Sequence, residues 1–150
     1  MSIELDEMDR GILKRLQDDA RIAFRIIAEE LGLSESTVFV RVKKLQEKGI
    51  IKRFTTTVSP ELVGKGLTAF ILIKVNPQKY PVVLETLKKN NDIYEIYDVT
   101  GNYYTIAKVR VGSREDLAKI IDEIGLIEGI TSTETAIVLR KIKEEIRINL

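Results

Sequence analysis

The sequence IAEELGLSESTVFVRVKKLQEKGII, residues 27–51, predicts two helices joined by a tight turn. Gly32 is expected to end the first helix, and Ser34 to cap a second helix that runs to Lys48 and stops at Gly49. Upstream, LDEMDRGILKRLQDDAR, residues 5–21, repeats apolar residues at helical spacing behind a cap at Asp6. Three helices with a glycine-containing turn before the last one predict a helix-turn-helix.

The third predicted helix carries apolar residues on two sides. At about 100° per residue, Val38, Val42 and Leu45 share one side, which is expected to face the core. The opposite side mixes hydroxyl, cationic and apolar groups, and consists of Ser36, Val40, Lys43 and Lys44, bordered by Thr37 and Phe39. The major groove of DNA offers hydrogen-bond acceptors and thymine methyl groups, so this composition favours groove contact.

Roles on this face follow from side-chain chemistry. Ser36, Thr37 and Arg41 can donate hydrogen bonds to bases, and Val40 can contact a thymine methyl group. Phe39 lies on the flank, where two interpretations stay open: contact with thymine methyl groups, or packing on a neighbouring helix or a partner subunit.

Positive charge is concentrated on this helix and the segment after it. Residues 41–53 hold six cations and one anion, a net charge of +5, so the rest of the chain carries −4 to give the total of +1. A solvated cationic surface would look the same in isolation. On the third helix of a helix-turn-helix, this charge predicts double-stranded DNA as the partner. Alanine at Arg41 or Lys44 should then weaken DNA binding and reduce its salt dependence.

The rest of the chain predicts a second domain. Residues 50–60, IIKRFTTTVSP, are rich in β-branched residues and predict a strand that forms a wing or leads into a linker, and Pro60, Gly64 and Gly66 indicate a boundary. Strands are then expected at 67–75, 93–101, 102–111 and 130–142, and helices at 80–90 and 113–125. This β-α-β-β-α-β order is typical of ferredoxin-like α+β domains, whose bare sheet face usually pairs with a second copy. The predicted division is a DNA-binding domain at 1–54, a strand and hinge linker at 55–66, and a domain at 67–150.

Several function classes are disfavoured by composition. The chain has no His and no Cys, which removes the commonest metal ligands, the commonest general base and all disulfides. No GxSxG, P-loop or GxGxxG motif is present, so we predict no catalytic residue, no metal site and no cofactor. No apolar run is long enough to span a membrane, and the acidic N-terminus lacks a signal-peptide core, so we predict a cytoplasmic location.

The motifs quoted above, together with YDVTGNYY at 97–104 and EGITSTETAIVL at 128–139, resemble the Lrp/AsnC (feast/famine) family of transcription factors. The resemblance runs over nearly the whole chain. It implies a winged helix-turn-helix, a hinge and a βαββαβ domain that senses a ligand, and a homodimer that assembles to a tetramer or octamer. The DNA-reading positions that it implies are Ser34, Ser36, Thr37, Arg41 and Lys44. Positions 39 and 40, commonly polar in the family, are Phe and Val here.

The resemblance also implies an effector site at the loop Thr100, Gly101, Asn102, Tyr103, Tyr104, which commonly reads TGDYD in the family. Both acidic positions are lost here, so the partner expected for an amino-acid ammonium is missing. Glu134 could replace it if it faces the pocket, and the hydroxyls of Thr133 and Thr135 could hold a carboxylate. The plainer interpretation is a hairpin turn beside threonines chosen for strand propensity.

Three functions follow from these patterns. The first is a sequence-specific regulator tuned by a small molecule such as an amino acid. The second is an effector-independent regulator or DNA-organising protein, which the lost acidic residues favour. The third is a tetrapyrrole decarboxylase-like enzyme. Such enzymes resemble the same family, but they depend on His residues that this chain lacks.

Overall fold

The computed structural model describes residues 4–150, which divide into two compact units. The first holds the chain up to Thr57 together with Lys143–Leu150, and the second is Val58–Ile142. The division after Thr57 falls inside the predicted linker at 55–66. The final segment groups with the helical unit, whereas the sequence placed it in the domain at 67–150.

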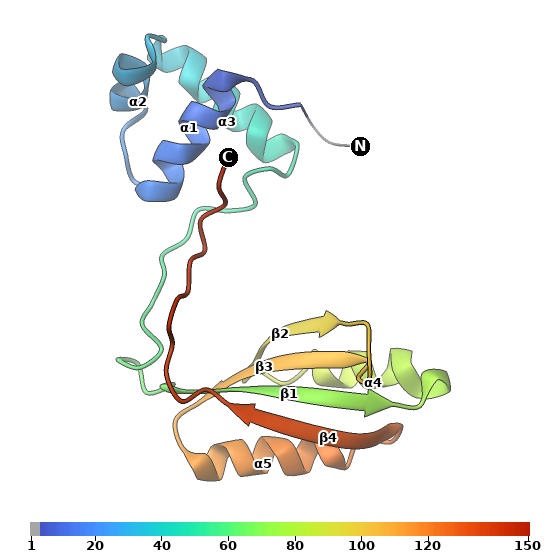
Figure 1. Ribbon diagram of the computed structural model, residues 1–150. Coiled ribbons are helices and arrows are strands. Elements are labelled where there is room, and N and C mark those ends of the chain that lie inside the picture. The colour runs from blue at the N-terminus through green and yellow to red at the C-terminus, as the bar shows by residue number, and fades with distance from the viewer. Residues whose placement is uncertain (1–3) are drawn as a thin grey trace. The chain divides into compact units, whose positions relative to one another are not determined.

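The helical unit contains the three predicted helices, α1 (Glu7–Asp18), α2 (Phe24–Leu31) and α3 (Glu35–Glu47) (Figure 1). The predicted caps are confirmed: Asp6 accepts from the Asp9 N–H, and Ser34 accepts from the Thr37 N–H. Gly32 ends α2 in the left-handed conformation at φ 65°, which lets the Leu33 N–H reach the Ala28 carbonyl at 2.9 Å. These caps fix the turn that presents α3.

The core of this unit uses the predicted apolar positions. Ile12 of α1, Ile27 of α2 and Val38 of α3 are completely buried, with Val42 and Leu45 nearly so. Each such side chain contributes about 1.5–3 kcal/mol to folding by leaving water. The core side of α3 is therefore confirmed, and its other faces are available for recognition.

The C-terminal segment joins the helical unit through α1. The side-chain amide of Gln17 donates to the Ile148 carbonyl at 3.0 Å and accepts from the Ile148 N–H at 2.7 Å. Beside this pair, Arg147 donates to Asp18 at 2.7 Å. The Gln17 side chain thus bonds to both backbone groups of Ile148. This contact holds the tail, Lys143–Leu150, to the helical unit.

The strand predicted over residues 50–60 is wrong. Within the described chain, this segment forms no ladder with another strand. Its β-branched residues favour extended backbone, but a strand also needs a neighbour whose backbone groups complete its hydrogen bonds, and propensity does not supply one.

The second unit is a four-stranded antiparallel sheet in the order β2-β3-β1-β4 (Figure 1). Its strands are β1 (Leu67–Val75), β2 (Ile93–Asp98), β3 (Thr105–Val111) and β4 (Ile130–Ile137). A 3-10 turn, Pro77–Lys79, leads into α4 (Tyr80–Leu87), and α5 (Arg114–Gly125) precedes β4. The β-α-β-β-α-β prediction is confirmed, with β2, β3 and β4 shorter than the sequence indicated.

Strand alternation gives this sheet two different faces. Ile71, Ile73 and Val109 are completely buried against Val83 of α4 and Ile120 of α5. Both helices therefore cover one face. On the open face, which lacks such cover in the described chain, the strands place Phe70, Leu72, Ile106 and Tyr97.

Candidate DNA-binding surface and effector site

The N-terminus of α3 holds a cluster of three hydroxyls. The Ser34 hydroxyl lies 2.7 Å from that of Thr37 and 3.0 Å from that of Ser36, while it also caps the helix. Ser34 is thus engaged in capping, which gives it a structural role beside the DNA-reading role that the resemblance implies. Ser36 and Thr37 lie on the exposed turn and keep hydroxyls within reach of an external partner.

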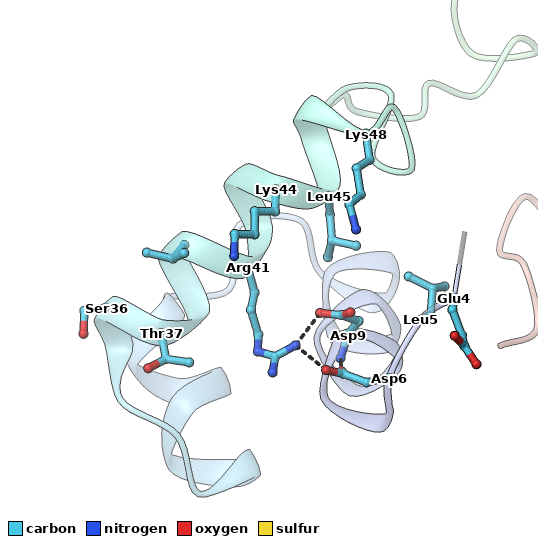
Figure 2. A pocket seen from close by; sticks show the side chains of 11 residues that line it. Glu4, Leu5, Asp6, Asp9, Ser36, Thr37, Arg41, Lys44, Leu45 and Lys48 are labelled. Atoms are coloured by element: carbon cyan, nitrogen blue, oxygen red, sulfur yellow. Dashed lines mark hydrogen bonds and ion pairs between the residues drawn. The ribbon is translucent and has the colours of Figure 1, made fainter. Parts of the chain in front are cut away.

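Arg41 is held by α1, which the sequence did not indicate. Its Nη1 donates to Asp6 at 2.7 Å and to Asp9 at 2.8 Å (Figure 2). The pKa of Asp6 is lowered from its usual value because the Asp9 N–H and then Arg41 donate to its carboxylate. The pKa of Arg41 is raised because Asp6 and then Asp9 accept from it. Both partners therefore stay ionised at neutral pH.

The lysines of α3 are less restrained than Arg41. Lys43 lies 4.0 Å from Glu47, the long limit of an exposed ion pair that contributes little. Among the residues that the structure describes, no carboxylate pairs with Lys44 or Lys48. These ammonium groups are available to phosphates.

A hollow of about 580 Å³ lies along one flank of α3, between it and the start of α1. Figure 2 shows Thr37, Arg41 and Lys44 on α3 on the side of this hollow, with Asp6 and Asp9 across from Arg41. Val40 also lines it, so its predicted place on the exposed face is confirmed.

Phe39 has an intramolecular contact. Its ring centroid lies 6.4 Å from that of Phe24 on α2, in a tilted arrangement, yet 57% of Phe39 stays exposed. Of the two interpretations offered by the sequence, packing on a neighbouring helix is realised. Much of the ring is still free to meet a further surface.

The predicted effector loop, residues 100–104, joins β2 to β3. Gly101 has φ 110°, a conformation that favours glycine, so Thr100, Gly101 and Asn102 form the turn. Tyr103 then donates its hydroxyl to Glu134, and Lys74 lies 5.3 Å from the centre of its ring. The Glu134 carboxylate raises the pKa of Tyr103 by favouring its protonated form. Tyr103 and Glu134 are therefore brought together.

Tyr104 belongs to a second group around α4. Its ring lies 5.9 Å from that of Tyr80, whose hydroxyl donates to Asp98 and lies 3.2 Å from the hydroxyl of buried Thr105. Sequence reasoning missed both Tyr80 and Asp98. Tyr80 lies outside every motif quoted above, and Asp98 lies in YDVTGNYY but precedes residues 100–104, where the resemblance places the effector site. The sequence showed only that Tyr80 begins a predicted helix and that Asp98 lies in a predicted strand. The fold brings these two residues together.

The register of β4 divides the other predicted effector residues. Glu134 pairs with Leu72 on the open face, whereas Thr133 and Thr135 pair with Ile73 and Ile71, which are buried against the helices. Glu134 and the two threonines thus lie on opposite faces of the sheet, and one small ligand on a single face does not meet all three.

Residues 4–150 contain no group of His, Cys, Asp and Glu side chains that could hold a metal ion. Within the same residues, none of the helices has the length and apolar character needed to cross a membrane.

The chain is similar to known proteins along both units. Residues 5–52 match a family of winged helix-turn-helix DNA-binding domains, and residues 68–148 match the Lrp/AsnC ligand binding domain. The HTH-type transcriptional regulator FL11 of Pyrococcus abyssi is 45% identical over 144 residues, which cover 96% of this chain and 95% of that protein. The regulator LrpA of Pyrococcus horikoshii is 40% identical over 140 residues, covering 93% and 99% of the two chains.

Solved structures agree. AsnC of E. coli superposes with a TM-score of 0.91 at 36% identity, covering 95% of this chain and 97% of that one. A feast or famine regulatory protein from M. tuberculosis, complexed with L-methionine, gives 0.85 at 28% identity, covering 97% and 99%. With the helix-turn-helix, the α+β fold and the family matches in agreement, this chain belongs to the Lrp/AsnC family of helix-turn-helix transcriptional regulators.

Proposed function

We propose that this regulator recognises short DNA sites through the exposed face of α3, that it does so as a dimer, and that an amino acid bound near residues 100–104 tunes the binding. The observation that carries the proposal is the composition of α3. One face is buried, and the other presents hydroxyls, Val40 and exposed lysines on a single capped helix.

The chemistry of that face suits a major groove. Lys43, Lys44 and Lys48 supply charge for phosphates, which gives affinity without sequence preference. Hydroxyl donors and an apolar group beside them can distinguish base pairs, since the major groove presents a different pattern for each.

The open face of the sheet supports a dimer. Phe70, Leu72 and Ile106 stay partly exposed there in the single chain, although they are apolar and adjacent in register. A second copy placed on this face would remove them from water, and a two-fold dimer would give two α3 helices for the two halves of a palindrome. The resemblance extends this to tetramers or octamers.

The effector part rests on Tyr103 and Glu134. Glu134 offers a carboxylate for an ammonium, on the face where Tyr103 and Lys74 also lie. The complex of the M. tuberculosis relative with L-methionine supports an amino acid as the ligand class. A DNA-bound regulator of this kind would act in the cytoplasm of a cell without a nucleus.

A second candidate, an effector-independent regulator, is favoured by one observation. The carboxylates that flank the loop, Glu134 and Asp98, already accept hydrogen bonds from Tyr103 and Tyr80. An incoming ammonium would share each carboxylate with a tyrosine hydroxyl, and this competition lowers its affinity.

In vitro selection from random duplexes, followed by fluorescence anisotropy, tests the DNA part. A shared half-site in the selected duplexes is expected, with affinity that falls steeply as salt increases. Recovery of duplexes with no shared sequence would contradict sequence-specific binding.

Calorimetric titration with the twenty amino acids tests the effector part. For an amino acid that binds through Glu134, Tyr103→Phe should bind severalfold more tightly, because the ammonium no longer competes with the tyrosine hydroxyl. Tyr104→Phe removes a hydroxyl from the neighbouring tyrosine and is the matched control. No heat with any amino acid would favour the effector-independent regulator.

A further inference from the structure

Arg41 differs from the other cations of α3 because it forms ion pairs with the first turn of α1. Its Nη1 is bonded to both Asp6 and Asp9, which lie 35 and 32 residues earlier in the chain. Among the described residues, Nε and Nη2 have no hydrogen-bond partner, so part of the donor set is still free. The side chain is 29% exposed and lines the same hollow as Thr37, Val40 and Lys44.

The charge of this group argues against a phosphate as its target. One guanidinium and two carboxylates give Arg41, Asp6 and Asp9 a combined charge of −1. A phosphate approaching Arg41 would also approach both carboxylates, and the attraction to the cation would be offset by repulsion. A neutral acceptor on a base does not experience this repulsion, and still gains the hydrogen bonds.

The geometry of the group suits a base edge. A free arginine side chain loses much conformational freedom when it binds, whereas one fixed beforehand loses little. Two carboxylates on a single nitrogen fix the plane of the guanidinium and leave the remaining donors in a rigid fork. Such a fork matches the O6 and N7 acceptors of guanine, the commonest specific contact of arginine in the major groove.

We propose that Asp6 and Asp9 are positioning residues that hold Arg41 as a guanine-reading side chain of α3, so that specificity depends on the first turn of α1. This inference rests on the proposed DNA recognition by α3, and names how that surface discriminates. It assigns phosphate contact to the lysines and base contact to the arginine.

The test compares two duplexes in the full-length protein by fluorescence anisotropy: the selected site, and a scrambled duplex of the same composition. Asp6→Asn combined with Asp9→Asn should lower the ratio of the two affinities by about tenfold. Affinity for the scrambled duplex should hold or increase, because two negative charges are removed near DNA. Asparagine keeps the cap of α1 at position 6.

Glu7→Gln is the matched control. Glu7 lies in the same turn of α1, is exposed and does not line the hollow, so this variant removes a neighbouring charge without releasing Arg41. It should change both affinities by the same factor. If the double variant behaves like Glu7→Gln, with the ratio unchanged, the two aspartates only neutralise charge and the inference is overturned.

A chemical arm identifies the acceptor. Replacement of guanine by 7-deazaguanine in the selected site should weaken the wild-type protein by about tenfold at the position read by Arg41, and should leave Arg41→Ala unaffected. Equal sensitivity of both proteins at every guanine would overturn base reading and assign Arg41 to phosphate. Loss of the salt dependence in Arg41→Ala would point to the same conclusion.

Two further cases have to be distinguished: a variant that does not fold, and a wild-type protein that does not recognise a DNA sequence. If the variant that combines Asp6→Asn and Asp9→Asn does not fold, as judged by circular dichroism, Arg41→Lys tests the same idea. This variant keeps the charge but loses the planar pair of donors. Its specificity ratio should fall while binding to the scrambled duplex holds, and an unchanged ratio would contradict the inference. A wild-type protein that selects no sequence at all would defeat the proposed DNA recognition itself.

Discussion

The proposed DNA-binding face and the proposed effector site differ in how many structural elements contribute to them. The exposed groups of α3 come from one helix, and its helical period placed Val38 inside and Val40 outside as predicted. The predicted effector residues come from a loop and from β4, and the register of the sheet separates Glu134 from Thr133 and Thr135. A site on one element can be read from its periodicity, whereas a site between elements depends on how they pair.

The strongest test of this contrast introduces the same carboxylate on the buried face and on the exposed face of α3. Val38→Asp should unfold the helical unit, because Val38 is completely buried and a carboxylate there would lack a partner, at a cost of several kcal/mol. Val40→Asp, at a position 48% exposed, should keep the thermal transition and lose DNA binding. Thermal melts by circular dichroism and anisotropy on the selected duplex separate the two. Equal melting temperatures would mean that the faces are misassigned.

The open face of the sheet offers the next test. Leu72→Asp should convert the protein to a monomer, since a carboxylate placed opposite Glu134 in a buried interface lacks a partner and costs about 3–5 kcal/mol, more than a hundredfold in the dissociation constant. Val82→Asp makes the same change on α4, at a residue 63% exposed, and should leave assembly intact. Light scattering measures both. An unchanged molar mass for Leu72→Asp would remove this face from the interface.

A smaller effect is expected for the lysines of α3. Lys44→Ala should weaken binding to selected and scrambled duplexes alike, and should reduce the slope of log affinity against log salt by about 1. Lys14→Ala, an exposed lysine of α1 outside the hollow, is the control and should keep the slope. Arg41→Ala should also keep it, which revises the sequence-based expectation that both residues act through salt-dependent contacts. Anisotropy titrations over a range of salt distinguish these cases.

The smallest expected effect is a change in thermal stability at low pH. The pKa of Asp6 is lower in the folded protein than its ordinary value of 3.8, so its capping and ion-pair contribution to stability is fully present above about pH 4. The contribution should fade as the pH falls through the lower folded value, because the carboxylate must then be protonated. Melting temperatures from pH 2 to pH 6 should fall more gently at low pH for Asp6→Asn than for the wild type. Parallel curves would exclude Asp6 as a contributor.

Local patterns predicted most of the fold. The caps at Asp6 and Ser34, the glycine that ends α2, and the order of elements in the second unit were all confirmed. The strand predicted at residues 50–60 is wrong for a specific reason. β-propensity is a property of a single segment, whereas a strand needs a second segment to complete its hydrogen bonds. The sequence placed the tail at 143–150 in the domain at 67–150. Its grouping with the helical unit depends on contacts with Gln17 and Asp18, which lie well over a hundred residues earlier in the chain.

By itself, the sequence determined the order of the helices and strands within each unit, which side of α3 is buried, and where positive charge gathers. These properties depend on neighbours within a few residues, through capping, periodicity and side-chain chemistry. Only the tertiary structure decided that Arg41 meets the carboxylates of Asp6 and Asp9, while Lys44 meets none within residues 4–150, and that Glu134 lies on the opposite sheet face from Thr133 and Thr135. Those outcomes depend on which distant elements pack together and in what register, and no local pattern in the chain encodes them.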